Sequence, residues 1–253
     1  MAGLDHFLNA ARFLTILPAP PSSAAPETDW LARAMKHFAL VGAGVGCASA
    51  VVFVLASHIW GSPLAAIMAV AVSVILTGAL HEDGLADTAD AFGGGWTIEK
   101  RLAIMKDSRI GSYGALALGF SVLLRIAALA TLSPWEGAAA LVAVHATARA
   151  APALLMNNMA YVGDTAAMKV GYDRSGMVSA DLLFLLLTAL AFALPLAFIS
   201  IPSAFAGLAG GAVLATALAL WSRKLIGGYT GDVLGAAEQV FEIGFLLGVA
   251  ATI

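Results

Sequence analysis

Long apolar segments alternate with short polar connections along the whole chain. Each of the first six has roughly the twenty residues that a helix needs to cross the hydrocarbon core of a bilayer. A seventh begins near Val240 and has about 14 residues before the chain ends. The pattern predicts an all-α, polytopic membrane bundle with six transmembrane helices, or seven if the last segment also crosses. The six longer segments are approximately 38–60, 63–80, 114–132, 137–156, 182–201 and 203–221.

Composition agrees with this pattern. Of the 253 residues, 60% are hydrophobic and only 11% are charged, and the mean hydropathy is +0.90. These values lie far outside those of soluble globular domains. The net charge is −3, and Lys and Arg form no runs interleaved with aromatic residues. Nucleic acid is therefore not an expected partner, whereas the lipid bilayer is.

The first 37 residues are less hydrophobic and are predicted to lie at the membrane interface. Phe7, Leu8, Ala11 and Leu14 share one face of a helix, which indicates a short amphipathic helix that ends near Pro18. No internal repeat or separate soluble region follows. We therefore expect one transmembrane domain over residues 1–253, with residues 1–37 as its interfacial segment.

The basic residues predict the orientation, because short loops rich in Lys and Arg stay in the cytoplasm. With the amino terminus inside, Arg125 and Arg149 fall within spans and the other eleven Lys and Arg fall on the cytoplasmic side. The acidic residues gather on the same side, which places the expected polar active site there. The eleven are Arg12, Arg33, Lys36, Lys100, Arg101, Lys106, Arg109, Lys169, Arg174, Arg223 and Lys224.

The most informative polar segment is 81–113, which is expected to form the main catalytic region. Asp83, Asp87 and Asp90 stand at i, i+4 and i+7. On a continuous helix they would lie within roughly 60° of one another. Three like charges so close repel, and a hard divalent cation relieves that repulsion. The sequence therefore predicts a Mg²⁺ site, while Glu82 points away from it and is expected to support the site or face solvent.

The same segment continues with residues suited to a phosphorylated ligand. Lys106 supplies a mobile positive charge, Arg109 can bind phosphate in a bidentate manner, and Ser108 and Gly111 offer a hydroxyl and a backbone N–H group. Asp107 lies between the two cations and is a candidate catalytic acid or base. The glycines at 93–95 could approach a phosphate or could simply end a helix, and the sequence leaves both open.

A third polar group lies near the carboxyl end, where Thr230 and Asp232 stand in a glycine-rich turn. Thr230 is a candidate phosphate contact. Asp232 is a candidate catalytic or metal-site acid, or alternatively the N-cap of the last helix. Arg125 and Arg149, within spans, require partners. For Arg149 the favoured alternative is a side chain that snorkels to the membrane surface.

These residues resemble the family of adenosylcobinamide-GDP ribazoletransferase, also called cobalamin synthase or cobalamin-5′-phosphate synthase. The resemblance covers nearly the whole chain and depends on four motifs in order. Two departures are Glu82, where the family more often has an apolar residue, and Ala91, where a glycine is usual. Neither removes a candidate ligand. The motifs are 13–18 (FLTILP), 81–90 (HEDGLADTAD), 105–114 (MKDSRIGSYG) and 228–236 (GYTGDVLGA).

The resemblance implies the last step in assembling the nucleotide loop of vitamin B12. Adenosylcobinamide-GDP and α-ribazole, or its 5′-phosphate, would yield adenosylcobalamin, or its 5′-phosphate, and GMP with Mg²⁺. It also implies a multi-pass protein of the bacterial cytoplasmic membrane, and a homo-oligomer is compatible with it. We expect Asp83, Asp87 and Asp90 to organise the metal, and Asp107 or Asp232 to orient or deprotonate the attacking hydroxyl.

Two other functions are compatible with parts of this pattern. CDP-alcohol phosphotransferases also arrange aspartates around divalent metal, but their signature has an arginine where this chain has Asp87. Secondary transporters also contain charged residues within spans and glycine-broken helices. Transporter sites lie near the bilayer midplane between repeats, whereas these acids gather at one surface. Both are weaker alternatives to the ribazoletransferase reaction.

Overall fold

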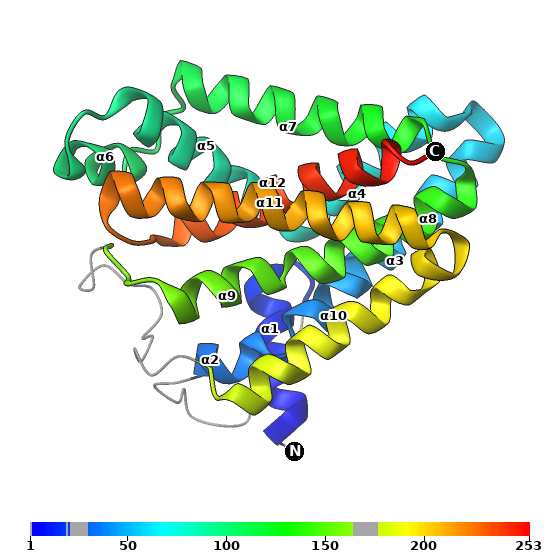
Figure 1. Ribbon diagram of the computed structural model, residues 1–253, viewed down its shortest axis with the longest axis horizontal. Coiled ribbons are helices and arrows are strands. Elements are labelled where there is room, and N and C mark those ends of the chain that lie inside the picture. The colour runs from blue at the N-terminus through cyan, green and yellow to red at the C-terminus, as the bar shows by residue number, and fades with distance from the viewer. Residues whose placement is uncertain (1, 19, 21–29, 164–176) are drawn as a thin grey trace.

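A computed structural model describes residues 2–18, 20, 30–163 and 177–253 of the chain (Figure 1). Lys169 and Arg174 lie outside these residues. Within them, the regular elements are twelve helices. Their bounds are α1 Ala2–Leu14, α2 Trp30–Met35, α3 Phe38–Trp60, α4 Ser62–Thr77, α5 Leu80–Gly94, α6 Ile98–Met105, α7 Ser112–Ala130, α8 Pro134–Ala148, α9 Ala150–Asn158, α10 Ser179–Ile199, α11 Ile201–Ile226 and α12 Gly231–Ala250.

Six of these helical segments are long and apolar enough to cross a membrane: α3, α7, α8 together with α9, α10, α11 and α12. Helices α4 and α5 meet that criterion only together, and they are bent by 90° at their junction. Figure 1 shows α7, α11 and α12 running side by side, with α5 and α6 gathered at one end of the bundle. The predicted all-α, polytopic fold is confirmed.

Two predicted segments differ from the observed helices. The last one is not short, because α12 begins at Gly231 and has 20 residues. Its polar residues Glu238, Gln239 and Glu242 are buried inside the protein, so they do not shorten the span. The segment 63–80 is interrupted, because Gly78 and Ala79 adopt positive φ angles of 62° and 58°. The left-handed backbone at these two residues turns the chain from α4 into α5.

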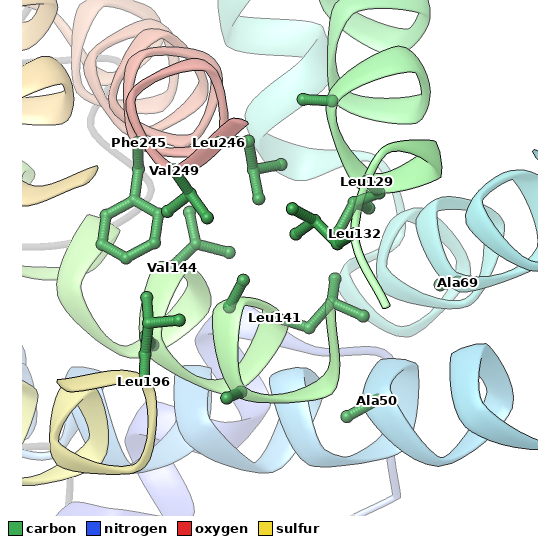
Figure 2. Packing of buried hydrophobic residues seen from close by; sticks show 14 of the residues in the cluster. Ala50, Ala69, Leu129, Leu132, Leu141, Val144, Leu196, Phe245, Leu246 and Val249 are labelled. Atoms are coloured by element: carbon green, nitrogen blue, oxygen red, sulfur yellow. The ribbon is translucent and has the colours of Figure 1, made fainter. Parts of the chain in front are cut away.

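Small residues let the helices approach closely, as in many membrane proteins. A Cβ atom on Gly46 of α3 would lie 2.6 Å from the carbonyl oxygen of Leu141 in α8, so only glycine fits there. Gly210 of α11 and Gly244 of α12 meet backbone to backbone in the same way. Figure 2 shows Leu141, Leu196 and Phe245 packed into the apolar core between these helices.

The amino-terminal helix forms as predicted and packs on the bundle. Helix α1 ends at Leu14, where Leu14 and Ala10 are buried in a cluster that also contains residues of α2 and α3. The Ile16 N–H donates to the carbonyl oxygen of Leu76 at 2.9 Å, which fastens the following residues to the end of α4. This helix therefore covers the side of the bundle on which α4 turns into α5.

Candidate active site

The acidic triplet lies on one continuous helix. Helix α5 extends through the whole run, which is the condition under which the i, i+4, i+7 spacing places the three aspartates on one face. Asp83 is exposed, Asp87 is half-buried and Asp90 is buried. The three carboxylates therefore follow one side of α5 from solvent into the protein.

A glycine contact brings α5 against the start of α12. A Cβ atom on Gly84 would lie 2.7 Å from the carbonyl oxygen of Asp232 and 3.2 Å from the Cα atom of Gly235. The two backbones can approach this closely only because both helices present glycine. Asp232 is thereby placed beside Asp83 and Asp87, although it lies about 150 residues further along the chain.

The four aspartates form one electrostatic group. The charges of Asp83, Asp90 and Asp232 all act on Asp87, and Asp83 also acts on Asp232. In the described parts of the chain, no Lys or Arg forms an ion pair with Asp83, Asp87 or Asp232. Among those residues, no group of three or more Asp, Glu, His or Cys side chains is arranged so that it could hold a metal ion by itself. The group is therefore acidic and open, and a metal ion bound there would need further ligands from water or substrate.

Asp90 has a structural task that sequence analysis missed. One of its carboxylate oxygens accepts a hydrogen bond from the Gly111 N–H at 2.7 Å, and the other accepts one from the Gly114 N–H at 2.8 Å. A carboxylate is favourable there because the first N–H groups of a helix lack partners within the helix. Asp90 thus caps α7 from α5. A side chain on Gly111 or Gly114 would collide with the Asp90 carboxylate, which explains both glycines.

The predicted phosphate contacts between α6 and α7 are exposed. Lys106 and Ser108 lie at the surface. Arg109 donates to both carboxylate oxygens of Asp107, with Nη2 to Oδ2 at 2.7 Å, and 88% of its side chain is exposed. Hydrogen bonds from the Arg109 side chain and backbone lower the pKa of Asp107 to about 2. Asp107 is therefore a weak proton acceptor in this arrangement.

The last motif forms the start of α12. Thr230 is the N-cap, because its hydroxyl accepts from the Val233 N–H at 3.4 Å. The interpretation of Asp232 as the N-cap is therefore wrong, since Asp232 already lies inside the helix. The preceding turn is held by the Tyr229 N–H, which donates to the Ala160 carbonyl oxygen at 2.9 Å. Asp232 remains available beside α5.

The glycines at 93–95 end α5. The helix stops at Gly94, and the Gly95 N–H donates to the Ala91 carbonyl oxygen at 2.9 Å. Gly93 lies against the ring of Tyr113, where a Cβ atom would be 2.5 Å from the ring. Of the two roles left open for these glycines, helix termination is the one observed.

A second group of charges is buried between the helices. Arg125 of α7 donates to Glu242 of α12 at 2.9 Å and to Glu82 of α5 at 3.1 Å. All three residues are less than 10% exposed. The expectation that Glu82 faces solvent is therefore wrong. The expectation that Arg125 requires partners inside the protein is confirmed.

Arg149 extends this buried group. It lies between α8 and α9, is 2% exposed and forms ion pairs with Glu238 and Glu242. The prediction that Arg149 snorkels to the surface is wrong, because these acids on α12 provide partners inside the bundle. His145 and His81 complete the group through contacts of 2.7 Å with Glu242 and 2.8 Å with Glu238.

Comparison with known proteins identifies the family. The chain matches the cobalamin-5-phosphate synthase family over residues 6–250. The chain belongs to that family. Among its relatives are adenosylcobinamide-GDP ribazoletransferases from Shewanella piezotolerans, 43% identical over 95% of this chain and 92% of the relative, and from Azorhizobium caulinodans, 44% identical over 95% and 93%. A further one from Leptothrix cholodnii is 38% identical over 98% of this chain and 97% of the relative. No solved structure matches.

As a cobalamin-5-phosphate synthase family member, the chain is an enzyme of cobalamin biosynthesis. Its sequence motifs come together in space in this fold. Leu14 from the first motif, Asp83 from the second and Asp232 from the fourth all line one cavity. The third motif joins them through the hydrogen bonds that Gly111 and Gly114 donate to Asp90. The resemblance and the geometry therefore indicate the same region.

Proposed function

We propose that this chain transfers the adenosylcobinamide-phosphate group of adenosylcobinamide-GDP to α-ribazole or to α-ribazole 5′-phosphate. The products are adenosylcobalamin or its 5′-phosphate, together with GMP. The family and the names of the relatives support this reaction. The single structural observation that carries it is the open group of Asp83, Asp87, Asp90 and Asp232, whose like charges act on one another and in which no described Lys or Arg forms an ion pair with Asp83, Asp87 or Asp232.

In this proposal Asp83 and Asp87 hold Mg²⁺, and Asp90 adds negative charge behind them while it caps α7. The residues fit the ion, because Mg²⁺ prefers carboxylate oxygens and commonly takes only one or two from the protein, the rest being waters and substrate phosphate oxygens. When bound, Mg²⁺ neutralises charge on the diphosphate that is cleaved. The exposure of Asp83 leaves a side open to substrate.

The reaction is a phosphoryl-type transfer. A sugar hydroxyl oxygen of α-ribazole forms a bond to the phosphorus attached to cobinamide, and the bond from that phosphorus to the GMP phosphate oxygen breaks. The hydroxyl proton passes to a nearby base. Asp232 suits this orienting role better than Asp107, because Asp232 lies beside α5 whereas Asp107 is engaged by Arg109. Positioning and charge neutralisation supply most of the rate enhancement in such reactions.

The basic loop supplies the phosphate contacts in this proposal. Lys106, Ser108 and Arg109 lie at the surface near the start of α7, so an approaching diphosphate can reach them. Arg109 would exchange its bond with Asp107 for a phosphate oxygen. Gly111 and Thr230 shape the adjoining helix starts. This side of the protein faces the cytoplasm of a bacterial cell in our proposal, because the basic connections lie on it.

The proposal is tested with the purified protein in detergent. The protein is given adenosylcobinamide-GDP, Mg²⁺ and either α-ribazole or its 5′-phosphate, and GMP and the corrinoid product are separated by chromatography. We expect equal amounts of both products, and no GMP when the acceptor is omitted. A protein that releases no GMP with either acceptor, but releases CMP from a CDP-alcohol, would contradict the proposal.

A further inference from the structure

A cavity of about 220 Å³ lies between the amino-terminal helices and the acidic group. Its walls differ in chemistry. One wall is apolar and comes from α1, α2 and α3, including Phe13, Met35 and Phe38. Another part of the lining comes from the glycine contact between α5 and α12 and includes Asp83 and Asp232. A ligand in this cavity would therefore touch an apolar surface on one side and the proposed reacting groups on the other.

The apolar wall presents aromatic ring surface. The rings of Phe13 and Phe38 are stacked, with centroids 5.8 Å apart and planes 16° apart. Trp30 and Phe13 form a T-shaped pair with ring centroids 6.1 Å apart. Phe38 is only 4% exposed, whereas Phe13 is 37% exposed. Phe13 thus adds an accessible ring to an already ordered cluster. Met156 of α9 contributes a flexible side chain to the same cavity. Such walls favour a flat aromatic group.

Size and charge restrict the group that fits. Pockets for whole drug-sized ligands usually measure about 300–1,000 Å³, so this cavity suits one portion of a substrate and is too small for a corrinoid ring. Apart from Asp83, which we propose to hold Mg²⁺, the acids that line it are Asp232 and Glu238, and these would repel a diphosphate inside the cavity. Arg149 is the one cation among its described lining residues, and Glu238 and Glu242 already engage it. The complementary group is aromatic and carries no negative charge.

We propose that this cavity binds the aromatic base of the acceptor nucleoside. The base lies against Phe13, and its ribose is directed toward Asp83 and Asp232. This inference rests on the proposed function, because that reaction supplies an acceptor in which a flat base is joined to a sugar hydroxyl. In this proposal α1 contributes to the acceptor site in addition to covering the bundle.

The test compares two phenylalanines of α1. Phe13→Leu removes a ring that lines the cavity. Phe7→Leu is the control, because the Phe7 ring lies outside the cavity. It forms a T-shaped pair with His37, with ring centroids 6.2 Å apart. Loss of an aromatic contact costs about 0.5–1.5 kcal/mol, so we expect the KM for α-ribazole to rise roughly 3- to 10-fold in Phe13→Leu. The KM for adenosylcobinamide-GDP and the kcat should stay within about 2-fold in both variants.

A second variant tests the volume of the cavity. Met156→Trp narrows it from α9, and equilibrium dialysis of α-ribazole with the full-length protein measures binding without turnover. We expect weaker binding in Met156→Trp and Phe13→Leu and wild-type binding in Phe7→Leu. Unchanged binding in both cavity variants would overturn the inference, as would an effect confined to adenosylcobinamide-GDP.

The same measurements separate this inference from the proposed reaction. A wild-type protein that forms product, with cavity variants that bind α-ribazole normally, overturns the acceptor site and supports the reaction. A wild-type protein that binds α-ribazole in a manner sensitive to Phe13 and Met156, yet releases no GMP, supports the acceptor site and contradicts the reaction.

Discussion

Helices α5 and α12 each carry acids of two kinds. Glu82 is buried and paired with Arg125, whereas its neighbour Asp83 is exposed and has no ion pair among the described residues. On α12, Glu242 is buried and paired with Arg149, whereas Asp232 lies in the first turn beside Asp87. One step along α5 is a rotation of about 100°. The helix face therefore decides whether an acid pairs with a cation inside the protein or stays open to a cation from solution.

Loss of a cationic partner should destabilise the protein most where the acid is buried. Removing one member of a buried ion pair leaves an uncompensated charge and costs about 3–5 kcal/mol. Removing an unpaired acid at the open group should instead affect chemistry and leave the fold intact. Substitutions of each kind therefore separate the structural acids from the catalytic ones.

The largest expected effect is on stability. Arg149→Met should lower the free energy of unfolding by about 3–5 kcal/mol, because Glu238 and Glu242 would both lose a partner inside the bundle. Thermal unfolding in detergent, followed by circular dichroism, measures the change. Lys224→Met removes an exposed cation from the end of α11 and should leave the unfolding temperature unchanged. Equal stability of the two variants would show that the buried network does not hold the helices.

The second effect is on catalysis. Asp87→Asn should lower kcat by about 100-fold or more, since removing one group that stabilises developing charge typically costs 10²–10³, while its unfolding temperature stays near that of the wild type. GMP release at saturating Mg²⁺ gives the rate. Glu99→Gln, which alters an exposed acid of α6 outside the group, is the matched control. Near wild-type turnover of Asp87→Asn at ordinary Mg²⁺ concentrations, below saturation, would exclude Asp87 from the metal site.

A smaller effect should follow from separating α5 and α12. Gly84→Ala places a Cβ atom 2.7 Å from the Asp232 carbonyl oxygen, so the helices must move apart and Asp232 must shift. Overpacking of this kind costs about 1–3 kcal/mol, and we expect kcat to fall roughly 10-fold. Gly119→Ala on α7 is the control, because nothing lies within 4 Å of its added Cβ atom. The contact would be unimportant if both variants were equally active.

The smallest effect is expected at Asp107. Arg109 lowers the pKa of Asp107 from 3.8 to about 2, so any stabilisation by this pair is present above pH 4 and is lost only as the pH falls through about 2. Asp107→Asn should therefore leave the pH profile of kcat unchanged between pH 5 and 9. Asp232→Asn should instead abolish the fall in kcat on the acidic side of that profile, its acidic limb. Loss of that limb in Asp107→Asn would make Asp107 the base.

The sequence could predict most of the fold and only part of the site. Apolar length predicted the spans of α3, α7, α8 with α9, α10 and α11, but not the bend after α4 or the full length of α12. The i, i+4, i+7 spacing predicted that α5 would present Asp83, Asp87 and Asp90 together. It could not predict that Asp90 caps α7, because that depends on the approach of Gly111 from a distant turn. It could not place Arg149 either, since its partners lie about 90 residues away on α12. Such pairings depend on tertiary packing.

The most direct test of the proposed metal site is Mn²⁺ binding, followed by electron paramagnetic resonance in the purified protein without substrates. We expect the wild type and Glu99→Gln to bind Mn²⁺ alike, and the double variant Asp83→Asn/Asp87→Asn to bind it at least about 10-fold more weakly while keeping the wild-type unfolding temperature. Equal Mn²⁺ affinity in the double variant and the wild type would contradict the account.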